Sequence, residues 1–291
     1  MTSRLMLAFC VLAGTTTVAS AQAPSPTGPP GLDHFECYYI TPRPIPPVDL
    51  RTWPRVVQAL MQLKDQFDDA RDQVTQVVDI RIGRFCNPVE KIVRGRRSST
   101  ISNPAARLTL FQLEPQPIVP RQVWISNQFG NQQLALSDAF ALAVPTGAAA
   151  IVPGTEPVSS LPIPKGLDHF KCYNASGRRI GLGVGLHDEI RSESTRVLAP
   201  IAFCNPVEKT RPPSTSNEPD VTPIMNAKAH LACYTIVPLP LPYGLTYLIT
   251  NQVGSGHIHI EGADVLCVPS WKVRWYDLST PRPRGGRGGG E

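Results

Sequence analysis

Apolar and polar residues alternate along much of the chain with the two-residue period of a β-strand. Phe35, Cys37 and Tyr39 occupy every second position of one such run. Short turns separate the runs, and Asn127-Gln128-Phe129-Gly130 has Asn first and Gly fourth, which suits a type I turn that closes a hairpin. The 31 prolines disfavour long helices. The pattern therefore predicts an all-β protein of antiparallel strands.

Two phrases of the sequence occur twice. Residues 31–35 read Gly-Leu-Asp-His-Phe and return at 166–170, and residues 85–91 read Phe-Cys-Asn-Pro-Val-Glu-Lys and return at 203–209. This duplication predicts two homologous domains in tandem. We place the domains at 31–146 and 166–272, with a Pro/Ala/Gly/Ser-rich linker at 147–165 and a Pro/Arg/Gly-rich tail at 273–291.

Each half divides again into two shorter units. Residues 231–234 echo residues 35–38, and residues 251–269 echo residues 127–145. We expect three or four antiparallel strands in each unit, and two units in each pseudo-twofold β domain. Either a sandwich or a partly closed barrel fits this plan, and we favour the sandwich.

The cysteines follow the same fourfold plan. In register, the second unit has Leu110 and Ala143 where the fourth has Cys233 and Cys267, so two cysteines are missing together. Joint loss is expected of a disulfide pair, because one leftover thiol is a liability in an oxidising compartment. We therefore predict disulfides within units, with crossed pairing between the units of a domain as the alternative. The predicted pairs are Cys37 with Cys86, Cys172 with Cys204, and Cys233 with Cys267.

One segment of the first half departs from the strand pattern. Its apolar residues recur at steps of four and three, with charged residues on the other faces: Val56, Leu60, Leu63, Phe67, Ala70, Val74 and Val77. This spacing predicts an amphipathic helix over about residues 54–78, inserted in the first domain. Its apolar seam would pack on that domain or, alternatively, form a dimer contact or a lid.

The N-terminus has the order of a secretory signal peptide. Arg4 precedes an apolar run, and Ala19-Ser20-Ala21 supplies a cleavage site of small residues. Removal of residues 1–21 also removes Cys10, which leaves six cysteines. No later stretch has the roughly 18 apolar residues of a membrane-spanning helix. We expect an exported protein that is secreted, periplasmic or on the cell surface.

The net charge of +5 comes largely from Arg94, Arg96, Arg97 and the tail. We interpret these residues as solvated surface, with an anionic partner as the alternative. The candidate partners are an anionic polysaccharide, an envelope lipid or another protein. Export argues against nucleic acid.

One polar cluster occurs in a single unit only. On a strand, His257, His259 and Glu261 project from one face while Ile258 and Ile260 face the core. Two imidazoles and a carboxylate can bind zinc or copper, so these residues are the candidate metal ligands. A solvated polar face is the other interpretation of the same pattern.

The remaining histidines point to architecture. His34, His169 and His230 each lie three residues before the first cysteine of their unit, where the second unit has Arg107. Residues that repeat are expected to be structural, since an active site is built only once. The glycine-rich run 181–185 and the pair His187-Asp188 are weaker candidates. No nucleophile motif or carboxylate pair indicates catalysis.

The motifs Asp-His-Phe-x-Cys-Tyr, Asn-Gln-x-Gly and Cys-Asn-Pro-Val-Glu-Lys, together with Leu-Cys-Val-Pro-Ser, resemble a family of exported bacterial repeat domains of unknown function. The resemblance covers about residues 31–146 and 166–272 and brings no assigned activity. We expect a non-enzymatic binding or structural protein of the bacterial envelope or extracellular space. The alternative is a metal-binding protein or metal-dependent enzyme that uses the His-x-His-x-Glu strand.

Overall fold

The computed structural model describes residues 28–41, 58–68, 75–116, 118–151, 161–211 and 220–278. These residues form thirteen strands and no helix, and all the strands belong to one antiparallel sheet. The strands are β1 (His34–Thr41), β2 (Gln58–Lys64), β3 (Thr75–Val93), β4 (Arg96–Ser99), β5 (Leu108–Gln116), β6 (Arg121–Asn127), β7 (Gly130–Ala150), β8 (His169–Gly177), β9 (Leu182–His187), β10 (Ser192–Arg211), β11 (Asp220–Thr222), β12 (His230–Asn251) and β13 (Gly254–Asp277). The predicted signal peptide at 1–21 and Cys10 lie outside the described residues.

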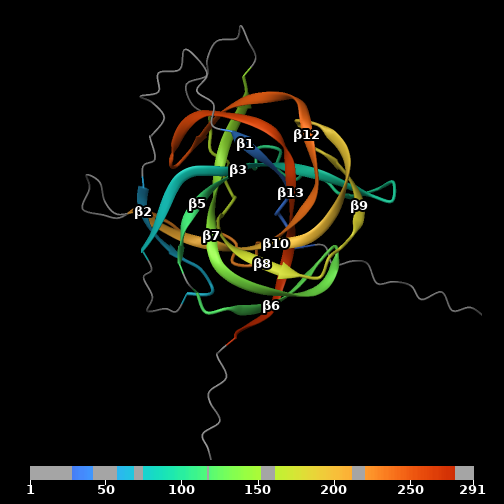
Figure 1. The fold of residues 1–291 in the computed structure, drawn as a ribbon. Helices are drawn as coiled ribbons and strands as arrows, with labels where there is room; N and C mark the ends of the chain where they lie inside the picture. The colour runs from blue at the N-terminus through green and yellow to red at the C-terminus, as the bar shows by residue number, and fades with distance from the viewer. Residues whose placement is uncertain are drawn as a thin grey trace, which may run out of the picture.

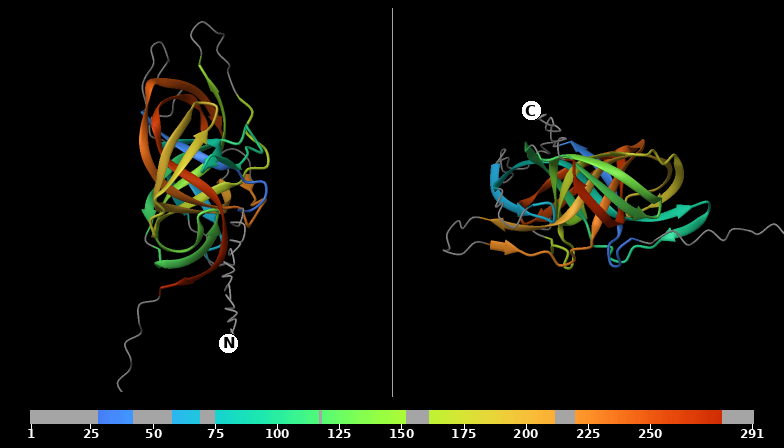
Figure 2. Two further views of the ribbon diagram at one scale, coloured as in Figure 1. Left: turned by 90° about the vertical axis from the view of Figure 1, so that its right-hand side faces the viewer. Right: turned by 90° about the horizontal axis from the view of Figure 1, so that it is seen from below.

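Eight of the strands close into a ring. They pair antiparallel in chain order, and the last returns to the first: β1, β3, β5, β7, β8, β10, β12 and β13. Figure 1 looks along this ring, and Figure 2 shows it from two further sides. The favoured sandwich is therefore wrong, and the structure has a closed architecture. Closure leaves this inner ring without a free edge along which another strand could pair.

The two sequence halves build the ring together. β7 of the first half pairs with β8 of the second, and β13 closes onto β1. Strands β2 and β9 each lie between β3 of the first half and β10 of the second. The structure therefore does not show two separate domains, because strands of both halves interleave in one sheet.

The ends of the predicted domains also differ from the strands. Residues 147–150, assigned to the linker, belong to β7 and pair with β12. Residues 273–277, assigned to the tail, belong to β13, and this stretch pairs with β6. The strands extend outward beyond the ring and add an outer layer to it.

The three predicted disulfides are confirmed, and crossed pairing is excluded. Cys37 bonds Cys86, Cys172 bonds Cys204, and Cys233 bonds Cys267. In each case the two cysteines face each other across neighbouring strands of one unit. Leu110 and Ala143 face each other in the same way in the second unit. The fourfold register read from the sequence is therefore the register of the ring.

The predicted helix is wrong within the described residues, since 58–64 and 75–93 are strands and 65–68 form a turn. Residues 54–57 and 69–74 lie outside the described part of the chain. Leu60 of the predicted seam is 55% exposed, whereas Met61 and Leu63 are buried, which is the alternation of a strand. β2 pairs on one side with β3 and on the other with β10. These long-range pairings outweigh the local period of the apolar residues.

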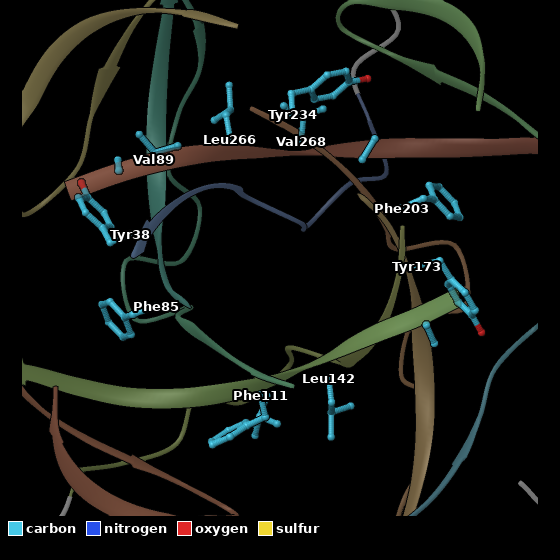
Figure 3. Packing of buried hydrophobic residues seen from close by; sticks show 14 of the residues in the cluster. Tyr38, Phe85, Val89, Phe111, Leu142, Tyr173, Phe203, Tyr234, Leu266 and Val268 are labelled. Carbon is cyan, nitrogen blue, oxygen red and sulfur yellow. The ribbon is translucent and has the colours of Figure 1, made fainter. Parts of the chain in front are cut away.

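Alternate side chains of the ring enter two different cores. One core holds the six paired cysteines with alanines, leucines and two phenylalanines, Phe35 and Phe170, and it lies inside the ring. The other holds the side chains that point outward, as Figure 3 shows for Phe111, Leu142, Tyr173 and Phe203. The outer strands and turns cover this second core, so both faces of the ring are buried and contribute to stability.

Four turns, which we call the tips, cover the outer core. They begin at Asp65, Asn127, Asp188 and Asn251, one in each unit. Each first side chain accepts a hydrogen bond from the backbone N–H two residues later, which fixes the turn. The same side chains bond to residues of the unit two places along the chain: Asp65 to Tyr173, Asn127 to Tyr234, Asp188 to Tyr38 and Asn251 to Thr146. The tips thereby tie opposite units of the ring together.

Candidate functional site

The candidate metal ligands lie on β13 as predicted, at alternate positions. Ile258 and Ile260 are buried, while His257, His259 and Glu261 are partly exposed on the other face. The hydroxyl of Thr246 lies 3.4 Å from Nδ1 of His259. Among the described residues, no group of three His, Cys, Asp or Glu side chains could hold a metal ion. The metal site stays a prediction, and the structure offers no preformed set of ligands for it.

Of the repeated histidines, His169 and His230 are buried and His34 is partly exposed. Burial lowers the pKa of His34, His169 and His230 to about 3 each, so the rings are neutral at ordinary pH. The side chain of Gln128, from the tip of the next unit, contacts His34. In the second unit, Arg107 instead forms an ion pair with Glu189 of the next tip. These contacts support the structural role inferred from the repeat.

The repeated aspartates are structural too. Both carboxylate oxygens of Asp33 accept backbone N–H groups, from Ser102 and Asn103. Asp168 accepts the same two bonds from Met225 and Asn226. Each aspartate therefore holds a loop of its own half rather than a ligand.

We call each contact between a tip and the opposite unit a junction. The junction made by Asp65 contains a buried carboxylate and a buried lysine. Asp65 accepts hydrogen bonds from the Tyr173 hydroxyl at 2.8 Å and from the Asn205 amide at 3.0 Å. Lys171, almost wholly buried, pairs with Asp68 of the same tip at 3.3 Å. Burial raises the pKa of the Asp65 carboxyl, and the Lys171 ammonium opposes that rise.

The junction made by Asp188 has the same polar frame. Asp188 accepts hydrogen bonds from the Tyr38 hydroxyl at 2.8 Å and from the Asn87 amide at 3.3 Å. Glu36 of the first unit occupies the position that Lys171 has in the third unit, and it is fully buried. Burial and the nearby Asp188 raise the pKa of Glu36 to about 8, and Arg191 of the tip opposes the rise. Neither junction opens to solvent at these groups, so we assign both to architecture.

An open cleft lies over β9, the strand that contains most of the glycine-rich run 181–185. On the outer face of this strand, Gly183 and Gly185 leave the backbone bare between β3 and β10. His187 at one end contacts the Ser192 hydroxyl, whereas Asp188 turns into its buried junction. The cleft therefore does not bring His187 and Asp188 to a common substrate.

A different surface brings two aromatic side chains together. It lies where β6 pairs with the end of β13, and we call it the aromatic surface: Gln122, Trp124, Arg274 and Tyr276. The rings of Trp124 and Tyr276 lie 5.0 Å apart, and the Tyr276 hydroxyl contacts the Gln122 amide. Tyr276 is 45% exposed. Val273 and Leu278 of the same segment are exposed as well.

The opposite face of the same strand pair holds the aromatic surface in place. Phe67 of the first tip packs against Trp275 with ring centroids 5.1 Å apart. Arg121 lies over both rings and forms an ion pair with Asp277 at 2.6 Å. Lys272 lies over the Phe67 ring at 4.5 Å. The end of β13 is therefore fixed on a tip of the first half, and its outer face is a rigid platform.

The sequence interpretation missed this surface because residues 273–291 were assigned to a tail. A signal was nevertheless present, since Trp271, Trp275 and Tyr276 alternate with cationic residues over a short stretch. The partner Trp124 is more than a hundred residues away in the chain. Only the pairing of β6 with β13 brings these residues together.

Three disulfides within the described residues indicate that the protein folds in an oxidising environment. No helix in the described part of the chain is long and apolar enough to cross a membrane.

Comparisons with known proteins place the chain among repeats without an assigned activity. A family described as a repeat of unknown function, DUF7450, matches residues 107–269, which is more than half of the chain. The match spans the second, third and fourth units. Neither the curated proteins nor the solved structures gave a match. The expected likeness to a repeat family of unknown function is thus confirmed, and the chain belongs to the DUF7450 family.

Proposed function

We propose that this protein is an exported, non-enzymatic binding protein that holds an acidic polysaccharide on its aromatic surface. The observation that carries the proposal is the pair of neighbouring rings at this surface, the half-buried Trp124 and the exposed Tyr276, with the exposed Arg274 beside them. Aromatic rings offer sugars a flat apolar face, and guanidinium groups bind carboxylates in a fixed geometry.

The charge of the protein supports an anionic ligand. The net charge is +5, and the sequence beyond Leu278 contains three further arginines, Arg282, Arg284 and Arg287. The signal peptide at 1–21 and the disulfides support work outside the cytoplasm, in the envelope or the extracellular space. The family match brings no enzymatic activity to set against this proposal.

The test is a titration of the purified mature protein with polygalacturonate and alginate, and with neutral dextran, at two salt concentrations. We expect acidic chains to bind and the binding to weaken as salt screens the arginines. The double substitution Trp124→Ala with Tyr276→Ala should reduce affinity at least about tenfold, since stacking on aromatic rings contributes on this scale.

Tyr243→Ala is the matched control, because Tyr243 is an 84% exposed aromatic residue on β12, outside the aromatic surface. No binding to any polysaccharide, or binding untouched by the double substitution, would overturn the proposal. Binding to anionic lipid vesicles without binding to polysaccharide would overturn the ligand class.

A further inference from the structure

We infer that Arg274 is a specificity-determining residue, which lowers the affinity of the Trp124 ring for neutral sugars and raises its affinity for acidic ones. This inference rests on the function proposed above. Arg274 Cζ lies over the Trp124 ring, 4.3 Å from its centroid. The guanidinium thus occupies the ring face that a stacked sugar would need.

Arg121 and Arg274 lie on the same strand pair but differ in the contacts of their guanidinium groups. Arg121 lies on the inner face and is fixed by its ion pair with Asp277. Arg274 is exposed, and among the described residues no carboxylate lies within ion-pair distance of it. Within the described part of the chain, the Arg274 guanidinium contacts the Trp124 ring without an ion pair, so that group can move when a better partner arrives.

The chemistry of the ligand decides whether the move is favourable. A neutral sugar must displace the guanidinium from the ring and offers it no charge in return, which costs affinity by about threefold at an exposed site. An acidic sugar accepts the guanidinium on its carboxylate, and a charge-assisted hydrogen bond of this kind favours binding by about tenfold. The same residue therefore penalises one class of sugar and favours the other.

The strand register places the groups for both steps beside Trp124. Tyr276 and Gln122 lie on the same face and contact each other independently of Arg274. β13 also has an irregular register between Lys272 and Arg274, which places Arg274 opposite Trp124. A carboxylate drawn toward Arg274 is thereby held next to the ring on which its sugar stacks.

The experiment compares oligogalacturonate with its methyl ester, which has the same sugar rings without the charge. Affinities are measured by calorimetry for the wild type, Arg274→Ala and the double substitution Trp124→Ala with Tyr276→Ala. We expect Arg274→Ala to weaken binding of the acid about tenfold and to strengthen binding of the ester about threefold. Arg179→Ala removes an exposed arginine elsewhere and should change neither affinity appreciably.

The outcomes separate this inference from the proposed function. If Arg274→Ala weakens both ligands equally or changes neither, while the double substitution abolishes binding, the inferred role of Arg274 is wrong and the proposed function stands. If the wild type binds neither ligand, the inference about Arg274 is wrong, and the alginate titration then decides the proposed function. Opposite changes in affinity for the acid and the ester support the inferred role of Arg274, because a simple charge contact would leave the affinity for the ester unaffected.

Discussion

The junctions made by Asp65 and Asp188 share one polar frame, but a buried lysine beside the first is replaced by a buried glutamic acid beside the second. In both, a tip aspartate accepts a tyrosine hydroxyl and an asparagine amide from the opposite unit. Beside Asp65, a buried Lys171 meets an acidic tip residue, Asp68. Beside Asp188, a buried Glu36 lies in the field of a basic tip residue, Arg191. The tip residue near the lysine is acidic and forms an ion pair with it, whereas the tip residue near the glutamic acid is basic and forms its ion pair with Glu193.

This difference shows how a repeat protein can distinguish near-identical sites. If the two tips exchanged places, Asp68 would lie near Glu36, which offers it no cation, and Arg191 would lie near Lys171, where two like charges would meet in a buried site. Such contacts are strongly unfavourable, because buried charges that lack a partner lose their solvation. The other two junctions use asparagine and have no charge at these positions, since the second and fourth units place Thr109 and Ala232 there.

Reversal of one buried charge should have the largest effect on stability. Lys171→Glu places a third carboxylate beside Asp65 and Asp68, and we expect the free energy of unfolding to fall by about 4 kcal/mol. Adding Asp68→Lys recreates the polarity of the Asp188 junction and should restore at least half of the loss. Urea denaturation measures both variants, with the exposed Lys165→Glu as the control. A double variant no more stable than Lys171→Glu would show that the charges do not act as a pair.

A fourth disulfide should give the second unit the same covalent link that the other three units have. Leu110 and Ala143 face each other at the register of the paired cysteines, whose Cα atoms lie 3.9–4.0 Å apart in the other units. The double substitution Leu110→Cys with Ala143→Cys should form a bond and stabilise the oxidised protein by about 3 kcal/mol. Peptide mass spectrometry and thermal unfolding check this, with Leu110→Cys alone as the control. Free thiols at both positions would contradict the register.

The two junctions should also respond differently to pH. Glu36 has a folded pKa of about 8, above its ordinary value of 4.5, so its folded state keeps a proton that the unfolded state loses. Its contribution is complete below about pH 4.5 and is lost as pH rises through about 8. Glu36→Gln should therefore remove about 3 kcal/mol of the stability difference between pH 5 and pH 8. The exposed Glu114→Gln should leave the profile unchanged, and an unchanged profile for Glu36→Gln would refute the assignment.

The smallest expected effects come from the tyrosine hydroxyls. Tyr38→Phe and Tyr173→Phe each remove a donor from a buried carboxylate, and each should cost about 1–2 kcal/mol. Tyr234→Phe removes a partner of the neutral Asn127 amide and should cost less, about 1 kcal/mol. Equal losses in all three variants, measured by urea denaturation, would mean that carboxylate and amide junctions do not differ.

Local alternation and repetition were enough to predict the strands, the turns and the disulfides. The paired loss at Leu110 and Ala143 located the register, because a hairpin places such residues opposite each other whatever surrounds it. The same local reasoning failed for residues 58–64, where Leu60 and Leu63 share a helical seam with Phe67 but pair as a strand. The partner strand β10 lies in the other half of the chain, and no local pattern reports it.

The candidate binding site divides in the same way. Trp271, Trp275 and Tyr276 are visible as an aromatic cluster in the sequence, but their partner Trp124 belongs to another unit. The metal candidates His257, His259 and Glu261 share one face of a strand, as period-two alternation requires. Alternation alone does not bring three ligands to one point, because that depends on neighbouring strands.

The sequence by itself determined the all-β class, the four units and which cysteines pair, because these depend on contacts within a hairpin. Only the tertiary structure decided that the halves interleave in one ring and that each tip seats in the opposite unit. It also decided that β6 and β13 build the aromatic surface. These features arise from pairings between residues far apart in the chain, and their energy comes from buried polar and apolar contacts that exist only once the ring has closed.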